Sequence, residues 1–361
     1  ERQGGAAYLL RLNPHLGRAL RREYLRWRRP WSEADGPVDR EGRLRPLLAR
    51  HRLDQRPFSA STLQRFALCP YQFYLAALLR LEPRPQAEPL EEMDPLVRGS
   101  LVHQVQAQIM EPLRRAGLWP LKEGDLEAGR RVLDGVLDRV AQAFFEELAP
   151  AVPQVWQREV EALRADLHLW LQQLARRAQQ WEPLHFELAF GLPRHQDGDA
   201  ASSPDPVRLP GGFLLRGAVD WVERRREDGL LRVVDHKTGR PPWRERLVVG
   251  GGEVLQPLLY GLAVEALLGG EVGEGVLFYC TSQGRFQHRT VRLDSKNRQS
   301  LLEVLRIIDD HVGRGFLPPA PRERACQWCD FLPVCGQDEQ KRWQQKDPRG
   351  LDDLQRLRGM P

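Results

Sequence analysis

The sequence predicts a mixed α/β protein in which helices flank a central mixed β-sheet, and two patterns carry this prediction. From residue 99 to about 181, Leu, Val and Ala recur with Arg, Glu and Gln at the helical period, which indicates several helices packed beside a sheet. From residue 182 onward, strand-like alternation is interrupted by helical stretches at 256–268 and 300–312. We therefore expect an α/β core with a large helical insertion.

The expected strands differ in their patterns. Phe186, Leu188 and Phe190 alternate with less apolar neighbours, as in a strand with one buried face. The segments 213–223 and 230–236 flank a Glu-Asp-Gly turn sequence, which predicts a hairpin. Two further strands are expected at 275–281 and 287–293.

Changes of composition divide the chain into five expected segments. The first begins as a helix that should end at the Trp-Arg-Arg-Pro-Trp sequence of residues 27–31, because proline cannot continue a helix. Ser59 supplies a hydroxyl cap to a second helix, which leads to Cys69. The segments are a basic helical N-terminal arm (1–57), the Cys69 helix with a proline-rich linker (58–95), a helical region (96–182), the core sheet with its helices (183–317), and a cysteine-containing segment with the C-terminal tail (318–361).

The composition of the 361 residues is that of a globular protein, with 41% apolar and 29% charged residues. The longest apolar stretch, 255–268, contains Glu265 and is too short to cross a bilayer, so no membrane partner is expected. The N-terminus has no apolar signal core, which favours the cytoplasm, and no initiating Met, which is typical of a fragment or a trimmed chain. Five cysteines do not make a disulfide framework at this length.

The net charge of +5 fits a polyanionic partner, although many unrelated basic proteins share it. Arginines are dense between residues 18 and 56, where acids such as Glu23 and Asp35 interrupt them. This stretch is either a solvated helical face or a surface that contacts phosphate groups.

The Val-Val-Asp-His-Lys-Thr-Gly sequence of residues 233–239 is the sharpest chemical signal. Side chains alternate along a strand, so Asp235 and Lys237 project from one face and His236 from the other. Alone, this pair could be a surface ion pair of little energetic weight. The hairpin, however, brings Asp220 next to Asp235, and two adjacent carboxylates become favourable when they share a divalent cation.

Such a group of side chains suits phosphodiester hydrolysis. A hard cation such as Mg²⁺ takes carboxylate and water oxygens, polarises the phosphate and lowers the pKa of a bound water. A neighbouring lysine such as Lys237 orients that water or stabilises charge in the transition state.

At these residues the chain resembles the PD-(D/E)xK nuclease superfamily, within it the RecB- and AddB-like branch that also includes CRISPR-associated adaptation nucleases. The resemblance rests on the order of short motifs over most of the chain. These are Ser-Ala-Ser-Thr-Leu at 59–63, Cys-Pro-Tyr-Gln-Phe-Tyr-Leu at 69–75, Arg-Gly-Ser-Leu-Val-His at 98–103, Gly-Ala-Val-Asp at 217–220, Asp-His-Lys-Thr-Gly at 235–239, Gln-Pro-Leu-Leu-Tyr at 256–260, and the C-terminal cysteines.

The resemblance implies a restriction-endonuclease-like core and a set of site residues. The implied ligands of Mg²⁺ or Mn²⁺ are His103, Asp220, Asp235 and the backbone carbonyl of His236, with Lys237 as the catalytic lysine. Gln256 and Tyr260 lie one helical turn apart and match an element that lies beside the site and contacts the nucleic acid. Val219 stands where the superfamily's name has proline, a departure that is usual in this branch.

Two of the candidate residues have plain alternatives. A histidine beside an apolar helical stripe such as Leu101, Val102 and Val105 is more often a solvated or core residue, and His103 becomes a ligand candidate only through the resemblance. Glu187 matches a recurrent acid upstream of the Gly-x-x-Asp motif, and it is either an additional site acid or a polar strand residue.

The cysteines form the second signal. Cys326, Cys329 and Cys335 have C-x2-C-x5-C spacing, one ligand short of a tetrahedral thiolate site, and Cys69 can complete it. In the resembling nucleases an upstream cysteine joins such a trio around a [4Fe-4S] cluster, which would staple distant parts of the domain together. Zinc remains the alternative, because spacing does not separate the two metals. Cys280 lies in an apolar strand and is expected to be a core thiol.

The sequence has no Gly-x-x-x-x-Gly-Lys-Ser/Thr motif, so this chain is not a complete helicase. AddB-like proteins carry their nuclease at the end of a longer helicase-like chain. The expected function is therefore a metal-dependent DNA nuclease, an exonuclease of DNA repair or recombination acting on single strands or duplex ends, with a helicase fused to it or bound as a separate partner. The alternatives are a catalytically idle iron–sulfur or zinc scaffold that binds DNA, and a zinc-ribbon protein.

Overall fold

The computed structural model describes residues 8–83, 90–193, 198–241, 247–336 and 338–361, and its centre is a mixed five-stranded sheet. The strands lie in the order β1, β4, β5, β6, β7, with β5 and β6 as the parallel pair. Their bounds are Trp181–Phe190 (β1), Gly217–Arg225 (β4), Leu231–Lys237 (β5), Val272–Tyr279 (β6) and Gln287–Arg292 (β7), and a separate small sheet joins β2 (Val207–Arg208) to β3 (Leu214–Leu215). The predicted α/β fold is confirmed.

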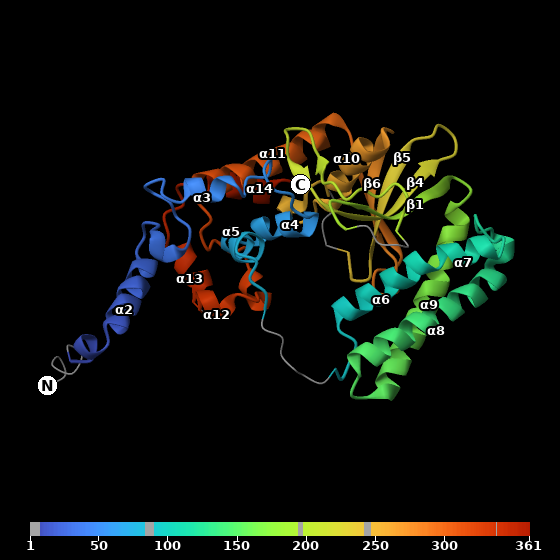
Figure 1. Ribbon diagram of the computed structural model, residues 1–361, viewed down its shortest axis with the longest axis horizontal. Coiled ribbons are helices and arrows are strands. Elements are labelled where there is room, and N and C mark those ends of the chain that lie inside the picture. Colours follow the sequence, from blue (N-terminus) through green and yellow to red (C-terminus); the bar gives the residue numbers. More distant parts are fainter. Residues whose placement is uncertain (1–7, 84–89, 194–197, 242–246, 337) are drawn as a thin grey trace.

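Helices cover both faces of the sheet, as Figure 1 shows. Helix α10 (Gln256–Leu268) forms the crossover that the parallel strands β5 and β6 require, and α11 (Ser295–Arg314) packs with it in the core on one face. Gly275 of β6 permits this close packing, because a Cβ there would overlap the carbonyl group of Pro257. On the other face, the Trp170 ring lies 5.7 Å from that of Trp221 in a second apolar core. Side chains of the central strands are thus divided between two separate cores.

The helical region occupies the side of the sheet opposite α10 and lies below it in Figure 1. Asp94 caps its first helix through hydrogen bonds of 2.8 Å from the amides of Leu96 and Val97. The bounds are Pro95–Gln108 (α6), Met110–Arg115 (α7), Glu123–Asp125 (η3), Leu126–Leu148 (α8) and Pro153–Arg177 (α9). The prediction of several helices beside the sheet is confirmed.

Strand β1 departs from regular alternation at Glu187, whose φ of +49° lies in the left-handed region. The register pairs Phe186 with Trp221 and continues past Glu187, so that Glu187 lies opposite Asp220. Phe186 packs in the core of the helical region, whereas Leu188 packs in the core of α10. The prediction that these two side chains share a face was wrong, because the left-handed backbone at Glu187 turns the side chains that follow it to the opposite face of the sheet.

The predicted hairpin of β4 and β5 is present, but its first strand is shorter than expected. The expected strand 213–223 is interrupted, and β4 begins only at Gly217. Just before it, the amide of Arg216 donates to the carbonyl oxygen of Phe58 at 3.0 Å. The backbone of this part therefore pairs with the segment 53–58 instead of the hairpin partner, which is why a single continuous strand was wrong here.

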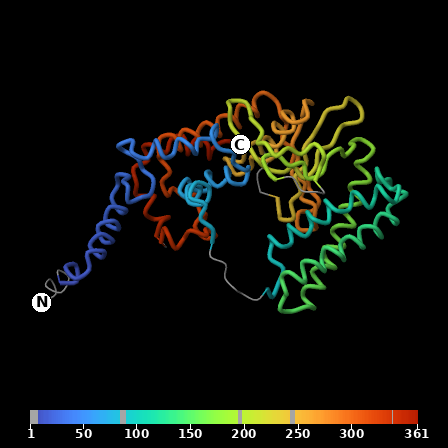
Figure 2. Tube along the Cα trace, in the orientation of Figure 1, coloured from blue at the N-terminus to red at the C-terminus, as the bar shows by residue number. Residues whose placement is uncertain are grey.

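The N-terminal part contains one helix that projects from the body, as Figure 2 shows. This helix, α2 (Pro14–Trp27), has no buried residue and ends where the sequence predicted. After it, Trp31, Val38, Leu48 and Leu53 pack into the same core as α10. The other elements of this part are η1 (Glu33–Asp35), α3 (Arg45–Ala49), α4 (Ala60–Leu68), α5 (Pro70–Phe73) and the π-helix η2 (Tyr74–Leu78).

The C-terminal segment folds back onto this N-terminal part. The Nζ atom of Lys346 lies 2.6 Å from Oδ1 of Asp35, and both side chains are at most 2% exposed. Leu351, Leu354 and Leu357 enter the main core. The remaining elements are η4 (Gly250–Gly252), η5 (Ala325–Trp328), α12 (Leu332–Cys335), α13 (Glu339–Gln344) and α14 (Asp352–Gly359). Among the described helices, none combines the length and the apolar character that a membrane span needs.

Candidate functional site

The site lies where β4 and β5 separate at the end of their hairpin. The register pairs Trp221 with Val234, so one further step brings Asp220 opposite Asp235. Instead of continuing the ladder, the amide of His236 donates to Oδ2 of Asp220 at 2.6 Å. The hairpin therefore places two carboxylates side by side, as the sequence predicted.

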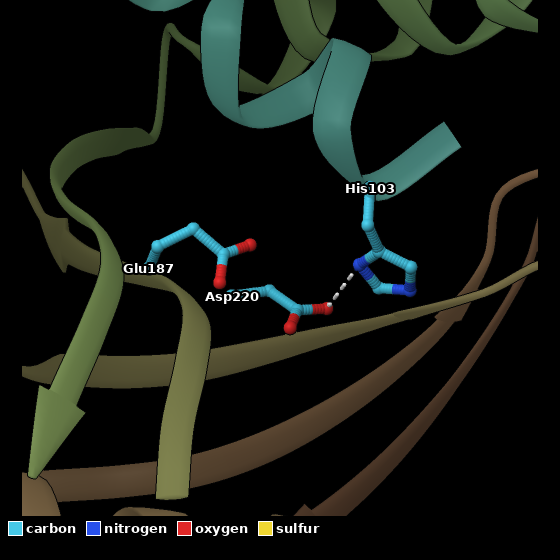
Figure 3. A group of neighbouring side chains, drawn as sticks. All are labelled: His103, Glu187 and Asp220. Carbon is cyan, nitrogen blue, oxygen red and sulfur yellow. Dashed lines mark ion pairs between the residues drawn. The ribbon is translucent and has the colours of Figure 1, made fainter. Parts of the chain in front are cut away.

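Three side chains from different elements converge next to this point, as Figure 3 shows. His103 comes from α6, Glu187 from β1 and Asp220 from β4, and one ligand atom from each lies within 4.8 Å of the other two. Nδ1 of His103 is 3.4 Å from Oδ2 of Asp220. An imidazole nitrogen and two carboxylates at this spacing fit a divalent cation.

The electrostatics of these carboxylates fit the same conclusion. Burial raises the pKa of Glu187 to about 8, and the charges of Asp220 and Asp235 add to this effect. Burial and the charge of Asp220 likewise raise the pKa of Asp235 to about 6, against the opposing effect of Lys237. For Asp220 burial opposes ionisation, but the imidazole of His236 and the charge of His103 hold its pKa below the ordinary value. Crowded carboxylates of this kind lose their mutual repulsion when a cation binds between them.

Asp235 is held by residues of β5 and α10. Its Oδ2 lies 2.6 Å from Nζ of Lys237, the same-face pair that strand alternation predicts, and its Oδ1 accepts a hydrogen bond of 3.1 Å from Nε2 of Gln256. Tyr260, one turn further along α10, is 8% exposed. Its pKa is raised by burial and by Asp235, so the phenol keeps its proton. Asp235 thus contacts Lys237 and Gln256. His103, Glu187 and Asp220 form the closely spaced group of three beside it.

His236 faces the core of the helical region, on the side of β5 opposite to Asp235, as alternation predicts. Its ring accepts a hydrogen bond at Nε2 from the indole Nε1 of Trp170, at 3.3 Å. Because indole is only a donor, Nε2 is unprotonated, which leaves the ring proton on Nδ1, 3.6 Å from Oδ2 of Asp220. Sequence reasoning missed Trp170, because it belongs to an apolar stripe of α9 in which nothing distinguishes it from other core residues.

The four predicted cysteines come together at a second place, between the N-terminal and C-terminal parts. Cys69, Cys326, Cys329 and Cys335 line one cavity. Burial raises the pKa of the Cys69 thiol to about 12, and the charge of Cys329 adds to the effect. Four neighbouring thiols with raised pKa values suit a bound metal cation, because the cation stabilises their thiolate forms. Cys280 is buried in the core, as expected, and its thiol donates to the carbonyl oxygen of Lys237 at 3.6 Å.

Comparison with known proteins agrees with this arrangement. Residues 57–336, most of the chain, match the PD-(D/E)XK nuclease superfamily. The chain belongs to this superfamily. Its mixed sheet flanked by helices is consistent with the restriction-endonuclease-like core that the superfamily implies.

Several proteins are similar to this superfamily member. A protein of Symbiobacterium thermophilum, named as a subunit of an ATP-dependent helicase/deoxyribonuclease, is 33% identical over 67% of this chain and 20% of its own length. A protein of the same name from Moorella thermoacetica is 29% identical over 82% of this chain and 27% of its own length. The Gene 69 protein of Mycobacterium phage D29 is 29% identical over 34% of this chain and 43% of its length. The chain thus spans only about a quarter of the helicase/deoxyribonuclease subunits that it matches.

Proposed function

We propose that this chain hydrolyses phosphodiester bonds of DNA as the nuclease part of a helicase–nuclease system, with Mg²⁺ or Mn²⁺ as its cofactor. The observation that carries the proposal is the convergence of His103, Glu187 and Asp220 beside the Asp235–Lys237 pair. Membership of a nuclease superfamily and the deoxyribonuclease names of the relatives support it. An exonucleolytic role in DNA repair or recombination, on single strands or duplex ends, belongs to the same proposal, as does a cytoplasmic location.

In this proposal, His103, Asp220 and Asp235 hold the cation, together with the backbone carbonyl of His236, and Glu187 supplies an additional carboxylate. When bound, the cation polarises the phosphate and provides a hydroxide-like water near neutral pH. The protein's own contribution is to present ionised carboxylates at fixed positions. His236 assists by donating its amide to Asp220, which favours the ionised form of that carboxylate.

Lys237 is the proposed catalytic lysine. Its ammonium group lies 2.6 Å from Asp235 and its side chain is 33% exposed, so it can reach a bound phosphate without leaving the site. There it would orient the attacking water or stabilise negative charge in the transition state. Gln256 fixes the second oxygen of Asp235, and Tyr260 remains a neutral donor beside them, where a nucleic-acid strand would pass.

The four cysteines are proposed to hold a [4Fe-4S] cluster, with zinc as the alternative. Support comes from their position on one cavity, where Cys69 belongs to the N-terminal half and the other three to the C-terminal segment. Thiolate ligands suit both metals, and the role of the group would be structural. An anaerobic preparation with broad visible absorbance near about 400 nm supports iron–sulfur, whereas bound zinc without that absorbance would replace it.

A cleavage assay tests the proposed nuclease. Fluorescent single-stranded and duplex DNA are incubated with the protein and Mg²⁺ or Mn²⁺. We expect Asp235→Asn and Lys237→Gln each to lower the cleavage rate by about 100-fold or more. The matched control is Asp228→Asn in the hairpin turn, whose carboxylate pairs with Arg225 at the surface and whose loss should leave the rate unchanged. Wild-type rates in both site variants would refute the assignment, and DNA binding without cleavage by the wild type would favour the idle scaffold.

A further inference from the structure

A group of arginines outside the carboxylate site gathers where three distant segments meet. Arg56 lies in the segment 53–58, Arg80 follows the π-helix η2, and Arg216 directly precedes β4. The amide of Arg216 donates to Phe58, while the guanidinium of Arg56 lies 5.2 Å from the centre of the Phe58 ring. The three residues are called the arginine cluster below.

Like charges dominate this cluster. Burial and then the charges of Arg80 and Arg216 lower the pKa of Arg56. His51 accepts a hydrogen bond of 2.9 Å from Arg56, and its own pKa is lowered by burial and by the neighbouring arginines, so it adds an acceptor and no negative charge. Within the described ranges, no ion pair joins Arg56, Arg80 or Arg216 to a carboxylate, and no carboxylate is among the groups that shift the pKa of Arg56. A surface that holds cations together without counter-charges is suited to a polyanion.

The backbone also singles out Arg80. Its φ of +55° lies in the left-handed region, which a non-glycine residue adopts at a cost, and it comes two residues after a π-helix. Both features are enriched at functional sites, because the surrounding structure must hold them in place. Arg80 and Arg216 are exposed, so their guanidinium groups are open to a ligand.

A continuous path leads from the arginine cluster to the carboxylates. Arg216 precedes Asp220 by four residues, which in an extended strand corresponds to about 13 Å. Between them lies Gly217, where a Cβ would be 3.4 Å from Cε1 of Tyr260. Gln256, one turn from Tyr260 on α10, donates in turn to Asp235. The span equals the rise of roughly four nucleotides along one DNA strand.

We infer that the arginine cluster binds phosphate groups of the same DNA strand that enters the carboxylate site, a few nucleotides from the bond to be cleaved. This inference rests on the proposed function, because it takes DNA as the ligand. Guanidinium groups bind phosphate oxygens in a planar, bidentate manner, and three of them fix the register of a flexible strand without reading its bases. The cluster therefore positions the strand and takes no part in bond cleavage.

The test is the salt dependence of DNA binding. A fluorescein-labelled oligo-dT is titrated in EDTA, so that cleavage does not interfere, and anisotropy gives Kd at several NaCl concentrations. For the variant R56Q/R80Q/R216Q we expect Kd to rise about 10- to 100-fold at low salt. We also expect the slope of log Kd against log[NaCl] to fall by about 2, since each phosphate contact on a single strand contributes about 0.7.

The matched control removes three exposed arginines from the helical region, in R131Q/R139Q/R158Q, and should keep the wild-type slope within about 0.5. The charge-preserving variant R56K/R80K/R216K should retain most of the slope, which separates lost charge from lost folding. Equal slopes for the cluster variant and the control would overturn the inference. The two claims can fail separately. If Asp235→Asn cleaves DNA at the wild-type rate while the cluster variant still shows the reduced slope of log Kd against log[NaCl], the proposed function is refuted and DNA binding by the cluster stands.

Discussion

Replacing Glu187 with glutamine is expected to stabilise the metal-free protein at pH 8 and to change its stability little at pH 5. The carboxyl group has a pKa of about 8 in the folded protein and an ordinary value of 4.5, because it is buried and faces Asp220 and Asp235. Between pH 4.5 and about pH 8, the folded state therefore binds more protons than the unfolded state. The free energy of unfolding of the wild type must therefore fall as the pH rises through this window.

The size of the effect follows from the shift. At about 1.4 kcal/mol per pH unit, a pKa difference of roughly 3.5 units sets an upper bound of about 5 kcal/mol at pH 8. Because the new amide must also be packed and hydrogen-bonded, we expect a gain of about 2 to 4 kcal/mol at pH 8 and less than about 1 kcal/mol at pH 5.

Urea unfolding in EDTA at the two pH values measures this difference. The control is Glu182→Gln on the same strand. The Glu182 carboxylate pairs with Arg224 at 2.9 Å and has a lowered pKa, so this variant should be no more stable than the wild type at pH 8. Saturating Mg²⁺ should make the wild type the more stable of the two proteins, since Mg²⁺ binding stabilises the wild type more than the Glu187 variant. A variant that is less stable than the wild type at pH 8 in EDTA would refute the reasoning.

Three further changes test other parts of the structure. Trp170→Phe removes the donor to the buried ring of His236, and we expect weaker Mn²⁺ binding by calorimetry and about 1 to 3 kcal/mol lower stability in urea. Cys69→Ser should abolish metal binding at the cysteine cavity and raise amide hydrogen exchange in residues 326–335, as measured by mass spectrometry. Lys346→Met leaves the carboxylate of Asp35 buried without its cation and should cost about 3 to 5 kcal/mol in urea unfolding, whereas the double change with Asp35→Leu should recover most of this loss.

Much of the fold could be predicted because its signals are local. Ser59 accepts a hydrogen bond from the amide of Thr62 as the cap of α4, and Cys69 ends this helix. The helix 256–268 has the bounds that its apolar run predicts. Alternation alone placed Asp235 and Lys237 on one face, because the geometry of a strand leaves no other choice. Each of these features depends on residues within a few positions of one another.

The parts that escaped prediction depend on contacts between distant segments. The interruption before Gly217 arises because Phe58, more than 150 positions earlier in the chain, supplies the backbone partner of Arg216. The contact between Trp170 and His236 needs α9 to lie on the sheet, and an apolar helical stripe does not specify which of its members does so. Likewise, the left-handed conformation of Glu187 has no signal in its neighbours, since a glutamate is not a residue type that favours it.

The cysteine group was expected to act as the staple between the two ends of the domain, and the structure shows interactions that hold these ends together without the sulfurs. Arg358 of α14 donates to the carbonyl oxygens of Ala67 and Leu68, at the end of the helix that leads to Cys69, where carbonyl groups lack partners within the helix. Leu357 packs into the main core beside it. Because these contacts do not involve the sulfurs, the tail would remain attached if the metal were lost. With the proposed metal bound, the cysteines would fix the local loop of 326–335 against the end of α4, whereas the attachment of the ends rests on the core and on contacts such as those of Arg358 and Lys346.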